Sequence, residues 1–360
     1  MKKDLVLIAI TKNGVKKAAE LHKIIGGDLF VPEKFQNQVT GATFFSKSSK
    51  ELIPELFPLY REIVWVGALG ILVRFIGPLI KDKKTDPAVL SVDEQGKFVI
   101  SVLSGHLGGA NELAEKIADI LKAIPVVTTA SDVSGTIGVD ILGREFGWQI
   151  EDFEPATRVS AAVVNGEKVA FVQEAGEKNW WKKRNPLPSN IALCGSIEEA
   201  IKINPAALLL VTDRTNLAIP DELLKNTIIY RPKSLAIGMG CNRKVPLEEV
   251  EMAINNVLER QNLSFQSIKS FASIDKKNDE KAFLALSEKY TIPFVFYSAE
   301  ELNTIDPPTP SAYSLKYVGA KGVAEPAAML CAETETLIEI KQKTTNVTTA
   351  VARKQFTVDC

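Results

Sequence analysis

The sequence has 360 residues, more than one domain usually contains, and so predicts two or three domains. Hydrophobic residues make up 46% of the chain and charged residues 24%, which supports sizeable cores and excludes disorder as the main state. The formal charge is −1, from 43 basic and 44 acidic residues. It argues against general nucleic-acid binding, because phosphate contacts need a basic excess.

Membrane insertion and export are not expected either. The most apolar stretch, 63–80, contains Arg74 and Pro78 and does not suit a membrane-spanning helix. The apolar run at 5–10 is too short for a signal peptide. The four cysteines are scattered without a C-x-x-C pair, so free thiols in a reducing cytoplasm are expected. Only two histidines are present, which rules out a multi-histidine metal site within the chain.

Short apolar or β-rich runs alternate with amphipathic stretches along the chain. Strands are expected at 5–10, 63–66, 88–92, 98–103, 125–129, 169–172, 208–211, 235–237, 267–271, 294–297 and 337–341. Helices are expected at 110–123 and 247–261, where apolar residues recur on one face. The alternation predicts an α/β fold of mostly parallel sheets with flanking helices.

Two boundaries divide this series. We expect an N-terminal α/β domain at 1–146, a middle region and linker at 147–230, and a C-terminal α/β domain at 234–355. The second boundary is the clearer one, because the mixed segment 212–234 holds two prolines and a fresh strand–helix series follows it.

The most informative segment is 98–118. A strand ends at Leu103, a Ser-Gly-His-Leu-Gly-Gly turn follows, and a helix begins near Ala110. Loops at the carboxyl ends of parallel strands bind ligands, and unpaired helix amides suit a carboxylate or a phosphate. The residues themselves also allow a plain glycine-rich connector capped by His106.

Similar junctions follow other expected strands, and together they could present many N–H groups to anions, although ordinary turns would look the same. They contain Gly67, Gly70 and Arg74; Thr128, Thr129 and Asp132; Gly238, Gly240 and Arg243; and Gly319 and Gly322. The chain has no P-loop, no complete dinucleotide fingerprint and no nucleophile elbow. A serine triad is disfavoured, because Ser104 and His106 are too close in sequence for easy mutual contact.

Two sets of segments resemble one family. GALGILVRFIGPLIKDKKTDPAVLSVDEQGKFVISVLSGHLGGANELA and PVVTTASDVSG resemble the N-terminal signature of the cobalamin biosynthesis protein G family. LAIGMGCNRKVPLEEVEMAI, IPFVFYSAEEL and VGAKGVAEPAAMLCAE resemble its C-terminal domain. The resemblance covers about 63–353, and the stretch SDVSGTIGVD departs from the family's pattern.

The resemblance implies the cobalt-precorrin-5A hydrolase of anaerobic vitamin B12 biosynthesis. In that reaction water opens the ring-A δ-lactone of a cobalt-bearing tetrapyrrole, and a two-carbon unit leaves as acetaldehyde to give cobalt-precorrin-5B. The cobalt would arrive within the macrocycle, so we expect no cofactor and no metal site in the protein. The implied partners are this substrate and neighbouring corrin-pathway enzymes, with neither nucleic acid nor membrane.

The implied roles fall on the matching segments. His106 would be the general base, Asp132 would orient its imidazole, and Ser104 would lie with them at the catalytic centre. The substrate contacts would be Gly67, Gly70, Arg74, Gly105, Gly108, Gly109, Asn111, Thr128, Thr129, Gly238, Gly240, Arg243, Gly319, Gly322 and Glu325. We expect Gly67, Gly105 and Thr128 to share one sheet edge, facing a cleft with the C-terminal glycine loops.

Two alternatives stay open. A corrin-pathway methyltransferase or a nucleotide-using α/β enzyme would be indicated by a nucleotide retained during purification. A non-catalytic tetrapyrrole carrier would bind the lactone without releasing acetaldehyde.

Overall fold

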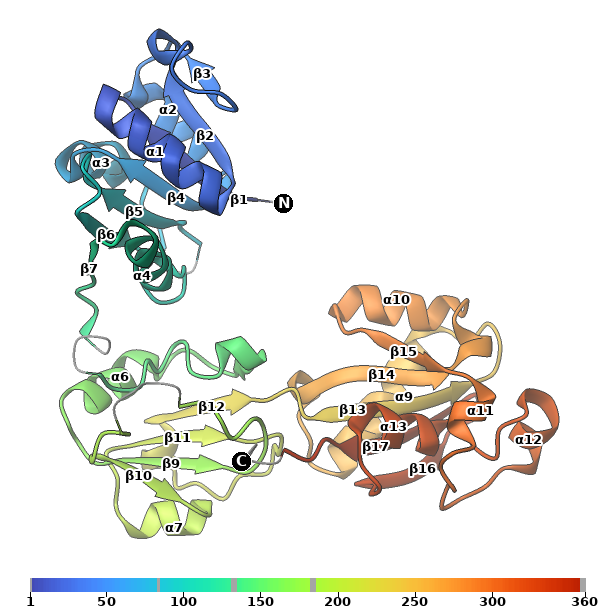
Figure 1. Cartoon of the computed structure of the whole chain (residues 1–360). Helices are drawn as coiled ribbons and strands as arrows, with labels where there is room; N and C mark the ends of the chain where they lie inside the picture. Colours follow the sequence, from blue (N-terminus) through green and yellow to red (C-terminus); the bar gives the residue numbers. More distant parts are fainter. Residues whose placement is uncertain (1, 83–84, 131–134, 182–185, 357–360) are drawn as a thin grey trace. The chain divides into compact units, whose positions relative to one another are not determined.

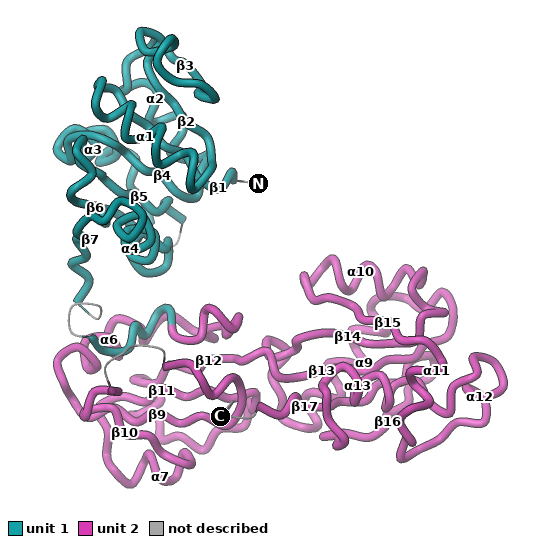
Figure 2. Tube along the Cα trace, viewed as in Figure 1, with its two compact units in different colours: residues 1–141 teal, residues 142–360 magenta. Residues whose placement is uncertain are grey.

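The computed structural model describes residues 2–82, 85–130, 135–181 and 186–356 (Figure 1). The chain divides into two compact units, 1–141 and 142–360 (Figure 2). The first contains one sheet and the second contains two, and most strand pairs are parallel. This confirms the predicted α/β class. None of the helices described is long and apolar enough to cross a membrane.

The first unit is built on a sheet with the strand order β3-β2-β1-β4-β5-β6-β7. Its strands are β1 (Lys3–Ala9), β2 (Asp28–Pro32), β3 (Thr43–Phe45), β4 (Tyr60–Val66), β5 (Ala88–Val92), β6 (Phe98–Leu103) and β7 (Ile124–Val126). Its helices are α1 (Lys12–Ile25), α2 (Ser49–Leu56), α3 (Leu69–Ile76) and α4 (Ala110–Leu121), with short 3-10 turns at Glu33–Phe35 and Gly77–Leu79.

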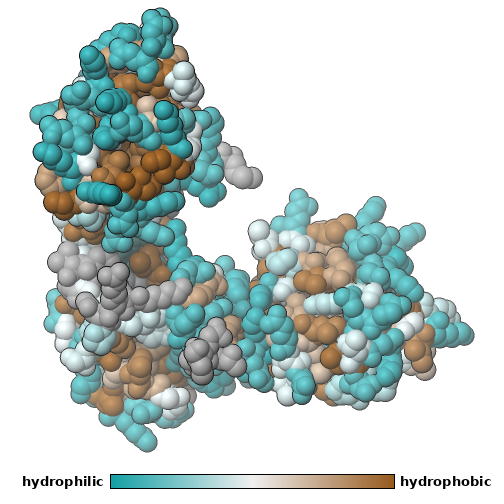
Figure 3. All heavy atoms as spheres, viewed as in Figure 1, coloured by the Kyte–Doolittle hydropathy of each residue, from teal (hydrophilic) through white to brown (hydrophobic). Residues whose placement is uncertain are grey.

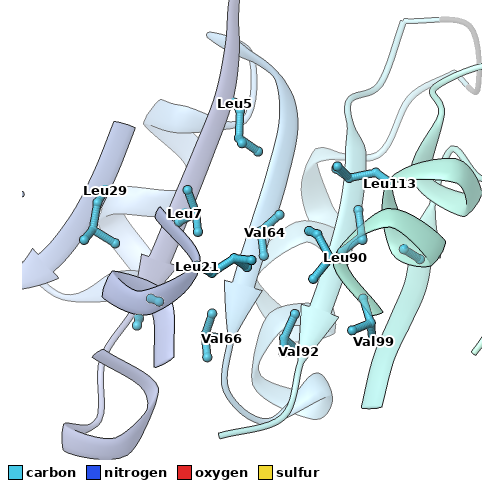
Figure 4. Packing of buried hydrophobic residues seen from close by; sticks show 14 of the residues in the cluster. Leu5, Leu7, Leu21, Leu29, Val64, Val66, Leu90, Val92, Val99 and Leu113 are labelled. Atoms are coloured by element: carbon cyan, nitrogen blue, oxygen red, sulfur yellow. The ribbon is translucent and has the colours of Figure 1, made fainter. Parts of the chain in front are cut away.

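Helices cover both faces of this sheet. Alternate residues of β1 point to opposite sides, so Leu7 lies in the core that includes α1 and α4 while Ile8 lies in the core that includes α2 and α3. Figure 4 shows the first of these cores, in which Leu21 of α1 and Leu113 of α4 lie over the strands. Burial on both faces explains the continuously apolar strands in the sequence. Hydrophilic side chains cover much of the visible surface, with apolar patches between them (Figure 3).

The sheet reverses direction between β5 and β6. Asp93 Oδ1 accepts hydrogen bonds from the amides of Lys97 (2.7 Å) and Phe98 (2.6 Å), which closes a tight turn. β6 therefore pairs antiparallel with β5, and Leu103 lies opposite Val89.

This reversal separates two of the predicted site loops. Val89 pairs with Ile63, three residues before the end of β4, so Gly67 follows β4 at one edge while Ser104 follows β6 at the other. β7 runs parallel to β6, which keeps Thr128 on the edge of Gly105. The expectation that Gly67 shares this edge is therefore wrong.

A half-buried carboxylate lies on β4. Burial raises the pKa of Glu62; Lys116 opposes the shift, and Asp4 and Glu112 add to it. The folded state thus holds the Glu62 proton more tightly than the unfolded state. The associated stability is present below the unfolded pKa and is lost as pH rises through the folded pKa.

Replacing Glu62 by Gln is therefore expected to raise the free energy of unfolding at pH 7 and to flatten its decline between pH 4 and pH 7. Urea unfolding at several pH values measures both effects. Glu335→Gln removes an exposed carboxylate and serves as the control. An unaltered profile in Glu62→Gln would contradict the prediction.

The middle region forms a sheet with the order β10-β9-β11-β12-β8. Its elements are β8 (Gln149–Ile150), α6 (Ala156–Val164), β9 (Val169–Gln173), β10 (Ile191–Cys194), α7 (Ile197–Lys202), β11 (Ala207–Val211), α8 (Asp221–Leu224) and β12 (Thr227–Arg231), with a 3-10 turn at Arg144–Phe146. The segment 212–234, expected as a linker, thus contributes β12 to the sheet. The predicted domain limits stay predictions.

The C-terminal sheet has the order β15-β14-β13-β17-β16. Its elements are β13 (Leu235–Cys241), α9 (Leu247–Arg260), β14 (Ile268–Ile274), α10 (Lys281–Tyr290), β15 (Phe294–Tyr297), α11 (Ala299–Leu302), α12 (Ala312–Val318), α13 (Ala324–Ala332), β16 (Glu339–Lys343) and β17 (Val347–Arg353), with 3-10 turns at Phe265–Ser267 and Asp275–Lys277. Helices α9 and α10 cover one face and α13 the other.

An ion pair joins the middle and C-terminal sheets of the second unit. Asp213 follows β11 and is 1% exposed. Both of its carboxylate oxygens accept from Arg353 of β17 at 2.7 Å, and Ser234 Oγ donates to Oδ2 at 2.7 Å. The carboxylate is therefore fully engaged by residues that come later in the chain.

Helix α13 packs unusually close to β13 because alanines face a glycine. Ala324 and Ala328 of α13 pack on Ala236 of β13. A Cβ added to Gly238 would lie 1.8 Å from the carbonyl oxygen of Ala324 and 2.6 Å from the amide nitrogen of Ala328. The sequence predicted that Gly238 opens its backbone to a ligand, whereas the described helix occupies that side of it.

Gly238→Ala is expected to lower the free energy of unfolding by at least about 3 kcal/mol, because the new methyl group meets helix backbone that cannot rotate away. Thermal and urea unfolding measure the loss. Gly77→Ala is the matched control: its Cβ would meet no atom within 4 Å, so a change within about 0.5 kcal/mol is expected. Equal stability of the two variants would show that α13 does not hold this position.

Candidate active site

The Ser-Gly-His-Leu-Gly-Gly segment forms a compact loop between β6 and α4. Ser104 adopts a left-handed backbone (φ 55°), and its hydroxyl donates to the carbonyl of Asp86 at 3.2 Å. A Cβ on Gly108 would lie 2.3 Å from Cβ of Ser104, so only glycine fits there. Gly109 is also left-handed (φ 89°) where α4 begins. These glycines are therefore required by the shape of the loop itself.

His106 projects from this loop toward an aspartate. Its Nδ1 lies 3.0 Å from Oδ1 of Asp140, and the two side chains are 12% and 18% exposed. A proton on Nδ1 bonded to Asp140 leaves Nε2 as the acceptor nitrogen. The ring is thereby held in the tautomer that a general base requires. The contact brings together two residues of the first unit.

The first amides of α4 are used inside the loop. Gly109 N donates to His106 O (3.0 Å), Ala110 N to Ser104 O (3.2 Å), and Asn111 N to Gly105 O (3.0 Å). These amides are therefore not available to an anion, contrary to the expectation for this helix end.

Other donors remain at the loop. Within the described part of the chain, the amides of Gly105 and Gly108 donate to no atom. They flank the histidine on either side in the sequence. Thr128, on the segment after β7, is exposed. These groups could donate hydrogen bonds to an anionic ligand beside the imidazole.

A buried amide links the loop to its neighbours. Asn111 is 7% exposed and lies at the second position of α4. Its Oδ1 accepts from Ser101 Oγ of β6 at 2.7 Å, and its Nδ2 donates to Thr129 Oγ1 at 2.8 Å. Asn111 thus ties together β6, α4 and the segment that follows β7.

Several of the other predicted residues lie away from this loop. Gly67, Gly70 and Arg74 belong to the opposite sheet edge, and the Arg74 guanidinium donates to the carbonyl of Gly70 at 3.1 Å. Asp132 lies outside the described residues.

The remaining predicted residues belong to the second unit. Among them, Glu325 is the one most clearly engaged by the protein itself. It is 1% exposed and accepts hydrogen bonds from the amide (3.0 Å) and hydroxyl (2.8 Å) of Thr309 and from the amide of Lys341 (3.0 Å). It therefore fastens the proline-rich loop to β16. A buried carboxylate whose oxygens are so engaged serves the fold.

The neighbours of Glu325 in the predicted set vary in environment. A Cβ on Gly240 would press on Thr348 Oγ1, one on Gly322 would press on Pro307, and Gly319 ends α12 with φ 80°. Arg243 is half-exposed, pairs with Asp279, and donates to the carbonyl of Lys276 at 2.6 Å. Of this group, only the Arg243 side chain presents a charge to solvent.

Sequence reasoning missed Asp140 and Ser101. Asp140 lies 34 residues after His106, and its spacing carries no recognisable motif. The one indication of Asp140 in the sequence is indirect: SDVSGTIGVD contains two aspartates, and the predicted site includes only the first, Asp132. Ser101 was hidden inside an apolar strand.

Within the described ranges, no three His, Cys, Asp or Glu side chains converge on a point that could hold a metal ion.

Family models for the "Cobalamin synthesis G N-terminal", "Cobalamin biosynthesis central region" and "Cobalamin synthesis G C-terminus" match residues 51–132, 137–232 and 235–352. A cobalt-precorrin-5A hydrolase of Priestia megaterium is 46% identical over 353 residues, which cover 97% of this chain and 94% of the relative. This chain belongs to the cobalamin synthesis G family.

Two further proteins are similar to this chain at lower identity. A cobalt-precorrin-5A hydrolase of Salmonella typhimurium is 30% identical to this cobalamin synthesis G chain over 97% of it and 98% of the relative. The crystal structure of CobE, from the cobalamin biosynthetic pathway, shares 28% identity over 33% of this chain and 90% of that one, with a TM-score of 0.32. The full-length matches place all of the site residues above within the family's extent.

Proposed function

We propose that this protein is a cobalt-precorrin-5A hydrolase that opens the ring-A δ-lactone and releases acetaldehyde to give cobalt-precorrin-5B. The observation that carries the proposal is the 46% identity to a hydrolase of that name along nearly the whole chain. The His106–Asp140 pair beside two unused loop amides supplies the groups that ester hydrolysis needs.

In this proposal His106 activates water. Asp140 accepts a hydrogen bond from the Nδ1–H group and orients the ring, so Nε2 takes a proton from water as the water oxygen attacks the lactone carbonyl carbon. The ring C–O bond then breaks, and the imidazolium returns the proton to the departing alcohol oxygen. One water is consumed, and a carboxylate and an alcohol are formed. The alcohol then loses its O–H proton and becomes a carbonyl as the C–C bond between its carbon and the macrocycle breaks. The electron pair of that bond and a proton stay with the macrocycle, and the two-carbon unit leaves as acetaldehyde.

The oxyanion of the tetrahedral intermediate needs donors. We assign this role to the Gly105 and Gly108 amides and to the Thr129 hydroxyl, which lie on the same loop as His106 or are tied to it through Asn111. Ser104, whose hydroxyl bonds to Asp86, serves the loop conformation. Thr128 and Arg243 are exposed enough to meet the macrocycle's carboxylates.

Cobalt is part of the substrate in this scheme. We expect it to arrive already bound in the macrocycle, with no cofactor supplied by the protein. A cytoplasmic location and contacts with neighbouring corrin-pathway enzymes remain predictions.

The test is turnover of cobalt-precorrin-5A by the purified chain. Release of one acetaldehyde per substrate, with the matching change in product mass, is expected. Binding of the lactone without acetaldehyde would indicate a carrier. A nucleotide retained by the protein would instead point to a different enzyme class.

A further inference from the structure

The hydrogen bonds around Asn111 have a direction as well as a position. A carboxamide has one accepting oxygen and one donating nitrogen, so its two ends are not equivalent. Ser101 Oγ donates to the Asn111 oxygen at 2.7 Å. The nitrogen therefore faces Thr129 and donates to its hydroxyl oxygen at 2.8 Å. Thr129 receives a proton in this arrangement and does not give one to Asn111.

The orientation of Asn111 is held by its surroundings. The side chain is 7% exposed, and its own backbone amide is bonded to Gly105 O at 3.0 Å. A Cβ on Gly105 would lie 2.6 Å from Oδ1, so the carboxamide rests directly against the Gly105 backbone. The absence of a side chain at Gly105 thus leaves room for the amide that faces Thr129.

We propose that Ser101 and Asn111 are positioning residues that make Thr129 a hydrogen-bond donor to the lactone oxyanion. A hydroxyl has one proton, and an oxygen that already accepts from Asn111 Nδ2 points that proton away from Asn111. A free hydroxyl would rotate between donating and accepting, whereas this one is set before substrate binds. Donors fixed in advance stabilise developing charge most effectively. The inference rests on the proposed hydrolase function.

Three variants test the direction of the hydrogen bonds that run from Ser101 through Asn111 to Thr129. Thr129→Val keeps the shape and removes the hydroxyl, Thr129→Ser keeps the hydroxyl, and Asn111→Asp keeps the shape but offers an oxygen where the amide nitrogen stood. In Asn111→Asp, the Thr129 proton would turn toward the carboxylate, while Ser101 could still donate to the other oxygen. Each is assayed for kcat and KM with cobalt-precorrin-5A, after circular dichroism and thermal unfolding confirm the fold.

Thr129→Val is expected to lower kcat by about 10²-fold with little change in KM, the loss typical of one oxyanion donor. Thr129→Ser should stay within a few fold of wild type. Asn111→Asp should lose about as much as Thr129→Val. The double variant Asn111→Asp/Thr129→Val should be no slower than either single variant, because both changes remove the same donated proton.

Multiplied losses in the double variant, or normal kcat in Thr129→Val, would overturn the inference. If Asn111→Asp fails to fold, Ser101→Ala takes its place: it removes the hydroxyl that donates to the amide oxygen, and should lower kcat in the otherwise wild-type protein but not in the Thr129→Val background. If the wild type is active, His106→Ala is inactive and the Thr129 variants are unaffected, then the role of Ser101, Asn111 and Thr129 is refuted while the proposed function stands. A wild type that releases no acetaldehyde would refute both the proposed function and the role of Ser101, Asn111 and Thr129.

Discussion

His106→Ala should lower kcat for cobalt-precorrin-5A by about 10²–10⁴-fold while the protein stays folded. The imidazole is the base of the proposed mechanism. Its Nδ1 lies 3.0 Å from Oδ1 of Asp140, and this contact orients the ring so that Nε2 can accept a proton. It lies on a loop whose shape depends on Ser104 and the glycines, so its removal should spare the fold. Acetaldehyde release measured under saturating substrate gives kcat directly.

His22 supplies a matched control. It is the other histidine of the chain, lies on α1, and contacts the carbonyl of Gly27 at 3.0 Å. His22→Ala should retain full activity. Asp140→Asn should lower kcat by up to about 10⁴-fold, because the amide keeps the size but can donate to Nδ1 and so favours the wrong tautomer. Near-normal turnover of His106→Ala, or equal damage from His22→Ala, would remove His106 from the mechanism.

Arg353→Ala should lower the free energy of unfolding by about 3 kcal/mol. The change leaves the Asp213 carboxylate, 1% exposed, with only the Ser234 hydroxyl among its side-chain partners in the described structure. The loss should fall at the lower end for a broken buried pair, because Arg353 is 38% exposed and its truncation admits water. Urea unfolding of the full chain measures it.

An exposed pair gives the comparison. Arg158 and Glu154 form a salt bridge at 2.7 Å on α6 and its approach, with side chains 50% and 64% exposed. Arg158→Ala should leave the free energy of unfolding almost unchanged, since exposed ion pairs are hydrated in both states. If the two arginine variants were equally stable, the Asp213 pair would not hold the two sheets together.

The strands with the strongest apolar character were predictable from sequence, and β6 and β15 match the expected limits. Others were missed for a physical reason. β17 reads VTTAVAR, in which Ala350 and Ala352 stand where large apolar residues would mark a strand, because alanines of α13 pack against them. β12 was missed because Pro220 and Pro232 flank it and made its surroundings look like a linker.

The site loop was predictable, but its partner was not. Gly105, Gly108 and His106 lie in a local motif that a single sequence displays. Asp140 reaches His106 only through the path of the chain after β7, which no local pattern encodes. The opposite position of Gly67 follows from the DEQGK turn, a hairpin signal present in the sequence but outweighed by the run of apolar strands.

The Asp213–Arg353 pair has a consequence for how the protein is made. The two residues are 140 positions apart, and β17, which carries Arg353, lies between β13 and β16 in the finished sheet. During synthesis at roughly 5–20 residues per second, Asp213 emerges about 7–30 s before its partner. Until then the Asp213 carboxylate lacks its arginine, and β13 is an open edge of the C-terminal sheet because β16 pairs only through β17. Both are completed by the same strand, so the second unit should mature in one late step.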